Sequence, residues 1–79
     1  MMIFLIEYNR KIRQIVTFNT FNDSERRKAE DARLQMELEL NRLAAEHEVV
    51  LLEAATEATL RRTHRRYFES LSELVKLPA

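Results

Sequence analysis

The chain has 79 residues, 46% hydrophobic, 33% charged and 8% aromatic, and its thirteen Lys and Arg balance its thirteen Asp and Glu. A chain of this length has room for one small core, so we expect a single α+β domain over residues 1–79. Cysteine is absent, which excludes disulfides and thiolate chemistry and agrees with a cytoplasmic location. Glycine is also absent, which excludes the glycine-rich phosphate loops of dinucleotide-binding and P-loop proteins.

The N-terminal segment predicts two strands. Residues 1–6 are apolar, but six residues are too few to cross a bilayer, and no basic region or cleavage site marks a signal peptide. Residues 2–8 are apolar on both faces, which is typical of a central strand. A polar break at residues 9–11 separates them from the β-branched run 12–18, so we predict a hairpin. Without glycine, we expect the chain to turn at its asparagines: Asn9, Asn19, Asn22 and Asn41.

A long helix is predicted to begin after Asn22. The Asn22 side chain can cap it, and Glu25, three residues later, can reach back to the cap amide. Apolar residues then recur at intervals of three and four, which predicts one helix face packed on a sheet. These residues are Ala29, Ala32, Met36, Leu40 and Leu43.

The same helix carries a second apolar face. At about 100° per residue, Leu34 and Leu38 lie nearly opposite the first face, and Ala45 joins them near the helix end. Only one face can cover the helix's own sheet, so the second needs a partner. We therefore expect a homodimer with two-fold symmetry and Leu34, Leu38 and Ala45 as candidate interface residues. The alternative is that these leucines are exposed without a partner.

The run Val49, Val50, Leu51 and Leu52 has two interpretations. A short buried strand would complete a three-stranded sheet, because two hairpin strands alone are not stable. One uninterrupted helix through this region also fits the spacing, and we favour the strand. A last helix is predicted from residue 57, capped by Thr56, to residue 74 or 76, with Leu60, His64 and Tyr67 on its apolar face and Pro78 at its end.

These elements predict a two-layer ββαβα domain of the α+β class. We expect a three-stranded mixed sheet of order 2-1-3 with both helices packed on one face. With Tyr8, residues 48–52 (EVVLL) and residues 61–68 (RRTHRRYF), the chain resembles a small bacterial family of uncharacterised proteins that have the same order of elements. The resemblance implies this topology and a bacterial origin, and it implies no activity.

The two histidines do not predict an active site. His64 lies on the apolar face of the last helix, where a ring is typically hydrogen-bonded and partly buried. His47 stands between Glu46 and Glu48, but neighbours in a strand point to opposite faces, so a solvated strand edge is favoured over a metal site. No serine has the spacing of a nucleophile elbow. We therefore expect no enzyme, no catalytic or metal-binding residue and no cofactor.

Basic residues form the sharpest local pattern. Four arginines occupy one arc of the last helix: Arg61, Arg62, Arg65 and Arg66. Arg10, Lys11 and Arg13 add a basic hairpin tip. These residues could grip phosphates, so binding of nucleic acid or another polyanion is the alternative function. We favour a protein-interaction module that acts as a homodimer, because neither an aromatic platform nor a net basic charge accompanies the arginines. Its expected partner is a second copy of itself or another protein, and no membrane association is expected.

Overall fold

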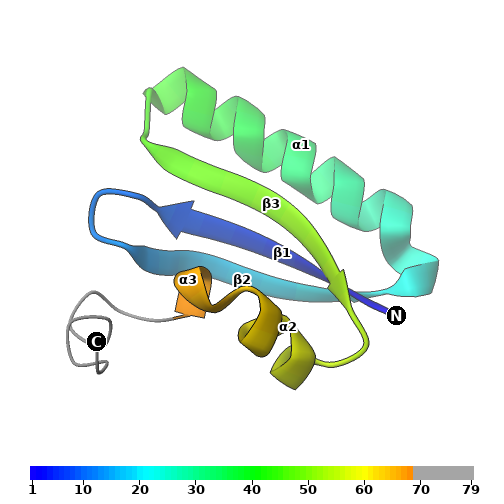
Figure 1. The fold of residues 1–79 in the computed structure, drawn as a ribbon. Helices are drawn as coiled ribbons and strands as arrows, with labels where there is room; N and C mark the ends of the chain where they lie inside the picture. Colours follow the sequence, from blue (N-terminus) through cyan, green and yellow to red (C-terminus); the bar gives the residue numbers. More distant parts are fainter. Residues whose placement is uncertain (69–79) are drawn as a thin grey trace, which may run out of the picture.

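The computed structural model describes residues 1–68 and has the element order ββαβα, with the last helical segment divided in two (Figure 1). The elements are β1 (Met2–Asn9), β2 (Gln14–Asn22), the short 3-10 helix η1 (Asp23–Glu25), α1 (Arg26–Leu43), β3 (His47–Ala54), α2 (Glu57–Thr63) and α3 (Arg65–Phe68). The predicted α+β class is confirmed. The strand predicted at residues 49–52 is also confirmed, extended at both ends, and the continuous-helix alternative is wrong.

The three strands form one sheet in the order β2-β1-β3, which confirms the predicted central position of β1. β1 is antiparallel to both neighbours, with Phe4 opposite Thr20 on one side and Leu52 on the other. The prediction of a mixed sheet is therefore wrong. β2 and β3 run parallel to each other, but β1 separates them, so every hydrogen-bonded pair in the sheet is antiparallel.

The helices cover opposite faces of the sheet, so the prediction that both pack on one face is wrong (Figure 1). Phe4, Ile6 and Tyr8 point to the face covered by α2 and α3, where they cluster with Leu60 and Tyr67. Alternate residues such as Leu5 point to the face of α1 and are also fully buried. The reason is that β1 is apolar on both sides, so a helix is needed on each side to shield it from water.

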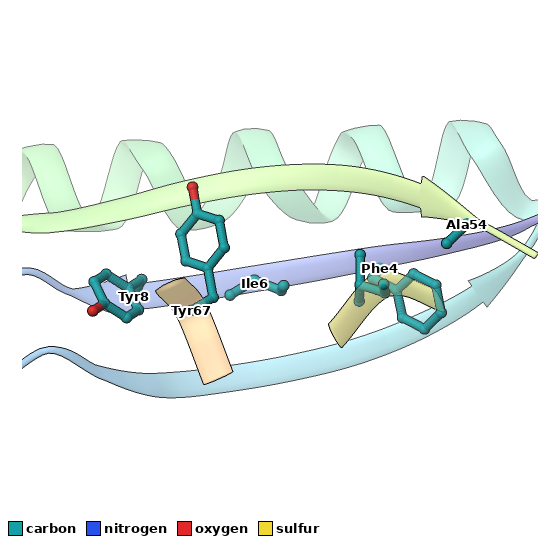
Figure 2. Close-up of a cluster of buried hydrophobic side chains, with 6 residues drawn as sticks. Phe4, Ile6, Tyr8, Ala54 and Tyr67 are labelled. Carbon is teal, nitrogen blue, oxygen red and sulfur yellow. The ribbon is translucent and has the colours of Figure 1, made fainter. Parts of the chain in front are cut away.

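The main core lies between the sheet and the α2–α3 pair (Figure 2). Phe4 and Leu60 are both 0% exposed and anchor it near α2. The Tyr8 and Tyr67 rings meet edge to face near the hairpin end, with centroids 5.2 Å apart. Phe18 of β2 adds a further ring to this core, with its centroid 5.7 Å from the centroid of the Phe4 ring.

The β1–β2 turn uses an arginine where glycine is usual. Asn9 begins the turn as expected, since its Oδ1 accepts hydrogen bonds from the backbone N–H groups of Lys11 (2.9 Å) and Ile12 (3.3 Å). Arg13 then adopts φ 56°, in the left-handed region. β2 accordingly begins at Gln14, later than predicted. The register shifts between Glu7 and Tyr8, which pair with Thr17 and Ile15, so Val16 of β2 has no partner on β1.

The ends of α1 follow the predicted chemistry in part. The Glu25 carboxylate accepts a hydrogen bond from the Asn22 backbone N–H at 3.0 Å, as the capping pattern indicates. At the other end Ala44, and not Asn41, takes the left-handed conformation with φ 53°. Asn19 lies within β2 opposite Leu5, so the prediction of a turn there is wrong.

The last helix is interrupted, contrary to the prediction of one helix from residue 57 to residue 74 or 76. Thr56 caps it as expected, accepting a hydrogen bond from the Thr59 backbone N–H at 3.1 Å. α2 ends at Thr63, whose hydroxyl donates to the Thr59 carbonyl at 2.9 Å, and His64 leaves the helical region with φ −125°. The predicted part beyond Phe68 lies outside the described residues. Within residues 1–68, no helix is long and apolar enough to cross a membrane.

Candidate functional site

The side of α1 that faces away from the sheet exposes two leucines. Leu34 is 52% exposed and Leu38, one turn later, is 55% exposed. Ala29, on the opposite side of the helix, is 0% exposed. The third residue predicted for this surface, Ala45, lies beyond the helix in the turn before β3, so it does not extend the leucine pair.

The contact of α1 with the sheet is thin for an 18-residue helix. Ala29 is its one fully buried residue. Ala32, Met36 and Leu40 are half-buried, and Leu43, predicted to face the sheet, is 58% exposed at the helix end. Ion pairs supplement this contact: Arg26 pairs with Glu53 of β3 and with Asp23, and these carboxylates, Glu53 first, raise the pKa of the Arg26 guanidinium.

The leucines belong to a row that runs the length of the helix. Arg27, Asp31, Leu34, Leu38 and Asn41 follow at alternating intervals of four and three, the spacing of the contact residues in paired helices. All five are exposed. We call this row the outer seam. It has an apolar centre with a charged or polar residue at each end, which is a pattern suited to a second helix.

The fold brings the basic hairpin tip next to the C-terminal arginines. Arg10 and Arg13 of the β1–β2 turn line a hollow of about 290 Å³ together with Arg66 and Tyr8. Arg13 also lines a hollow of about 450 Å³ with Arg61, in which the other lining residues are Gln14, Ile15, Phe18, Tyr67 and Phe68. A third hollow, of about 600 Å³, is lined by Ala58, Arg61, Arg62, Arg65 and Phe68. Six of the seven predicted basic residues therefore share one surface, and Lys11 is exposed at the adjoining turn.

Two of these arginines are held in place by neighbours. Arg66 donates to the Glu48 carboxylate at 2.6 Å and to the Tyr67 hydroxyl at 2.9 Å, and its guanidinium lies 4.4 Å from the centre of the Tyr67 ring. The Tyr67 hydroxyl, and then Glu48, raise the pKa of Arg66. Arg61 pairs with Glu57 at 3.1 Å and lies over the Phe68 ring at 4.6 Å. Both guanidinium groups are thus positioned by an aromatic ring.

The aromatic rings in this surface are what sequence reasoning missed. Phe18 of β2 meets Phe68 of α3 edge to face at 5.8 Å, and both rings line the hollow that Arg13 and Arg61 share. Fifty residues separate Phe18 from Phe68, so no local pattern could indicate that they meet.

A polar group on the other face of the sheet was also missed. His47 is not a solvated edge residue: its side chain is 21% exposed, and its Nδ1 contacts the buried Glu7 carboxylate. The second Glu7 oxygen accepts a hydrogen bond from the Thr17 hydroxyl at 2.9 Å. His64 has a local partner, with its Nδ1 3.0 Å from the Thr63 hydroxyl. Within residues 1–68, no group of three His, Asp or Glu side chains could hold a metal ion.

No family model, curated protein or solved structure matches this chain.

Proposed function

We propose that the protein is a non-catalytic interaction module that works as a homodimer, joined along the outer seam of α1. The observation that carries the proposal is the pair Leu34 and Leu38, each about half exposed, on a helix whose opposite side already serves the sheet. Two adjacent leucines that remain in water on a regular helix gain free energy when a second apolar surface covers them.

The charges of the outer seam favour an antiparallel pair of helices. When the two-fold axis crosses the pair of helices at the level of residue 36, Leu34 lies opposite Leu38 of the second copy. It also brings Asp31 to the level of Asn41 and Arg42 of that copy, where opposite charges meet. A parallel pair would instead place Arg27 against Arg27 and Asp31 against Asp31, and like charges in contact are destabilising. The second copy therefore runs in the opposite direction.

Dimerisation also compensates for the small amount of apolar surface that the single chain buries. Small domains bury too little apolar surface to be very stable alone, and this chain packs α1 on the sheet through one fully buried residue. A dimer covers the outer side of the same helix, so dimerisation and the stability of α1 are coupled.

The mass in solution tests the proposal. Light scattering or sedimentation at micromolar concentration should give twice the chain mass, and the Leu34→Glu, Leu38→Glu variant should give the monomer mass with its helical circular dichroism retained, because a charge in a dehydrated seam is costly. Leu43→Glu is the matched control: Leu43 is exposed to the same degree on the same helix but lies outside the outer seam, so the variant should stay dimeric. A monomeric wild type, or a control that dissociates equally, would contradict the proposal.

The direction of pairing is tested by cysteines, which the chain lacks. In the antiparallel pair, position 31 meets position 41 of the other copy, whereas two copies of position 31 are about 15 Å apart along the axis, beyond disulfide reach. Oxidation of Asp31→Cys alone or Asn41→Cys alone should therefore give no cross-linked dimer, and a mixture of the two should. Cross-linking of either variant with itself would instead indicate a parallel pair.

A further inference from the structure

The arginine-lined surface is a row, and neighbouring hollows share residues. Arg13 belongs to both the first and the second hollow, and Arg61 and Phe68 belong to both the second and the third. The row therefore continues from the β1–β2 turn, across the first half of β2, to the outer side of α2. Among the described residues that line it, six are arginines and none is an acid.

This surface is strongly positive although the chain is neutral overall. Seven cations gather here, the six arginines and Lys11, and two carboxylates, Glu48 and Glu57, pair with members of the group. Arg10, Arg13 and Arg62 make no ion pair with any of residues 1–68, so their guanidinium groups keep their hydrogen-bonding capacity.

The cations are interleaved with aromatic rings. Phe18 and Phe68 are half-buried, so each ring shows part of its surface in the middle hollow between Arg13 and Arg61. Arg61 lies over Phe68 and its Nε donates to Glu57, so the two terminal NH₂ groups of its guanidinium are the donors that remain for a phosphate. Arginine binds phosphate oxygens in pairs through such groups, and an aromatic ring beside it offers a surface for a nucleobase.

We propose that this row binds single-stranded nucleic acid. Successive phosphates lie on Arg10, Arg13, Arg61 and Arg62, and a base packs against the exposed parts of Phe18 and Phe68. A duplex fits less well, because its bases are stacked inside and cannot reach rings set between the arginines. Sequence specificity is not expected, since among residues 1–68 the lining offers mainly rings and guanidinium groups, with Gln14 as its one side-chain amide.

Fluorescence anisotropy with labelled oligo-dT and oligo-U of one to twelve nucleotides tests the proposal on the full chain. At 50 mM salt we expect a Kd on the order of 10⁻⁶ M for the longer oligomers, weakening about twentyfold by 150 mM salt if about four phosphates are contacted. Affinity should rise with length until the row is filled. A mononucleotide that binds as tightly as an octamer, or a duplex that binds as tightly as the single strand, would overturn the proposal.

Two variants locate the site. Arg13→Gly, which relieves the left-handed backbone at this position, should keep or raise the unfolding temperature, and together with Arg61→Ala it should weaken oligomer binding at least tenfold. The control is Lys28→Ala with Arg33→Ala on α1, on the other side of the sheet and outside the outer seam, which removes the same charge and should change affinity less than twofold. An equal loss in the control, or no measurable binding by the wild type at 50 mM salt, would show that the row is not a nucleic-acid site.

Discussion

Glu7 of β1 and His47 of β3 are joined across the sheet, forty residues apart in sequence. The Glu7 carboxylate, on a residue only 8% exposed, contacts the His47 ring through one oxygen and the Thr17 hydroxyl through the other. A single buried carboxylate therefore connects all three strands. This explains how a charged residue is accommodated in the otherwise apolar central strand, because both of its oxygens have partners.

Replacement of His47 should show how much its contact with the buried Glu7 carboxylate stabilises the protein. His47→Ala leaves one Glu7 oxygen without its partner, so we expect the free energy of unfolding to fall by about 1–3 kcal/mol in urea titrations at neutral pH. Glu46→Ala, at the exposed neighbouring position, should change it by less than about 0.5 kcal/mol. A loss of similar size in both variants would mean that the Glu7–His47 contact does not stabilise the sheet.

The covering of the sheet by α2 can be tested at Leu60. This residue is 0% exposed and packs in the core cluster with Phe4, so Leu60→Ala should destabilise the domain by about 2–5 kcal/mol. Leu43→Ala removes the same atoms from a side chain that is 58% exposed and should cost less than about 0.5 kcal/mol. Equal melting temperatures for the two variants would argue against α2 as part of the core.

A glycine at position 44 should stabilise the protein, because α1 ends there in a conformation that glycine favours. Ala44 closes α1 with φ 53°, a conformation that glycine adopts without the steric cost of a Cβ atom. Ala44→Gly should therefore raise the free energy of unfolding by about 1 kcal/mol in a denaturant titration. Ala58→Gly, at a helical position in α2, should lower it instead. The two variants must change stability in opposite directions for this explanation of the turn to hold.

Thermal unfolding offers a check on the dimer that is independent of mass. If folding and association are coupled, the melting temperature of the wild type should rise by roughly 3–5 °C for each tenfold increase in protein concentration. The Leu34→Glu, Leu38→Glu variant should melt at one temperature over the same range. A wild-type melting temperature that does not depend on concentration would speak against a dimer whose halves depend on each other.

Local pattern determined most of the secondary structure. The run at residues 2–8, apolar on both faces, indicated a central strand, and β1 is central. Thr56 and Glu25 indicated where helices start, because each can bond a backbone N–H three residues away. Both hydrogen bonds, from Thr59 to Thr56 and from Asn22 to Glu25, are present. Such features are predictable because their energetics depend on neighbouring residues, which the sequence lists in order.

Only the tertiary structure decided which residues from distant elements meet. Because β1 is apolar on both sides, its pattern could not say which helix covers which face, and the assignment of both helices to one face failed for that reason. The Glu7–His47 contact and the Phe18–Phe68 pair each join residues forty or more positions apart. Contacts of this kind depend on how the strands and helices pack in three dimensions, and packing is a property of the whole chain that no local spacing carries.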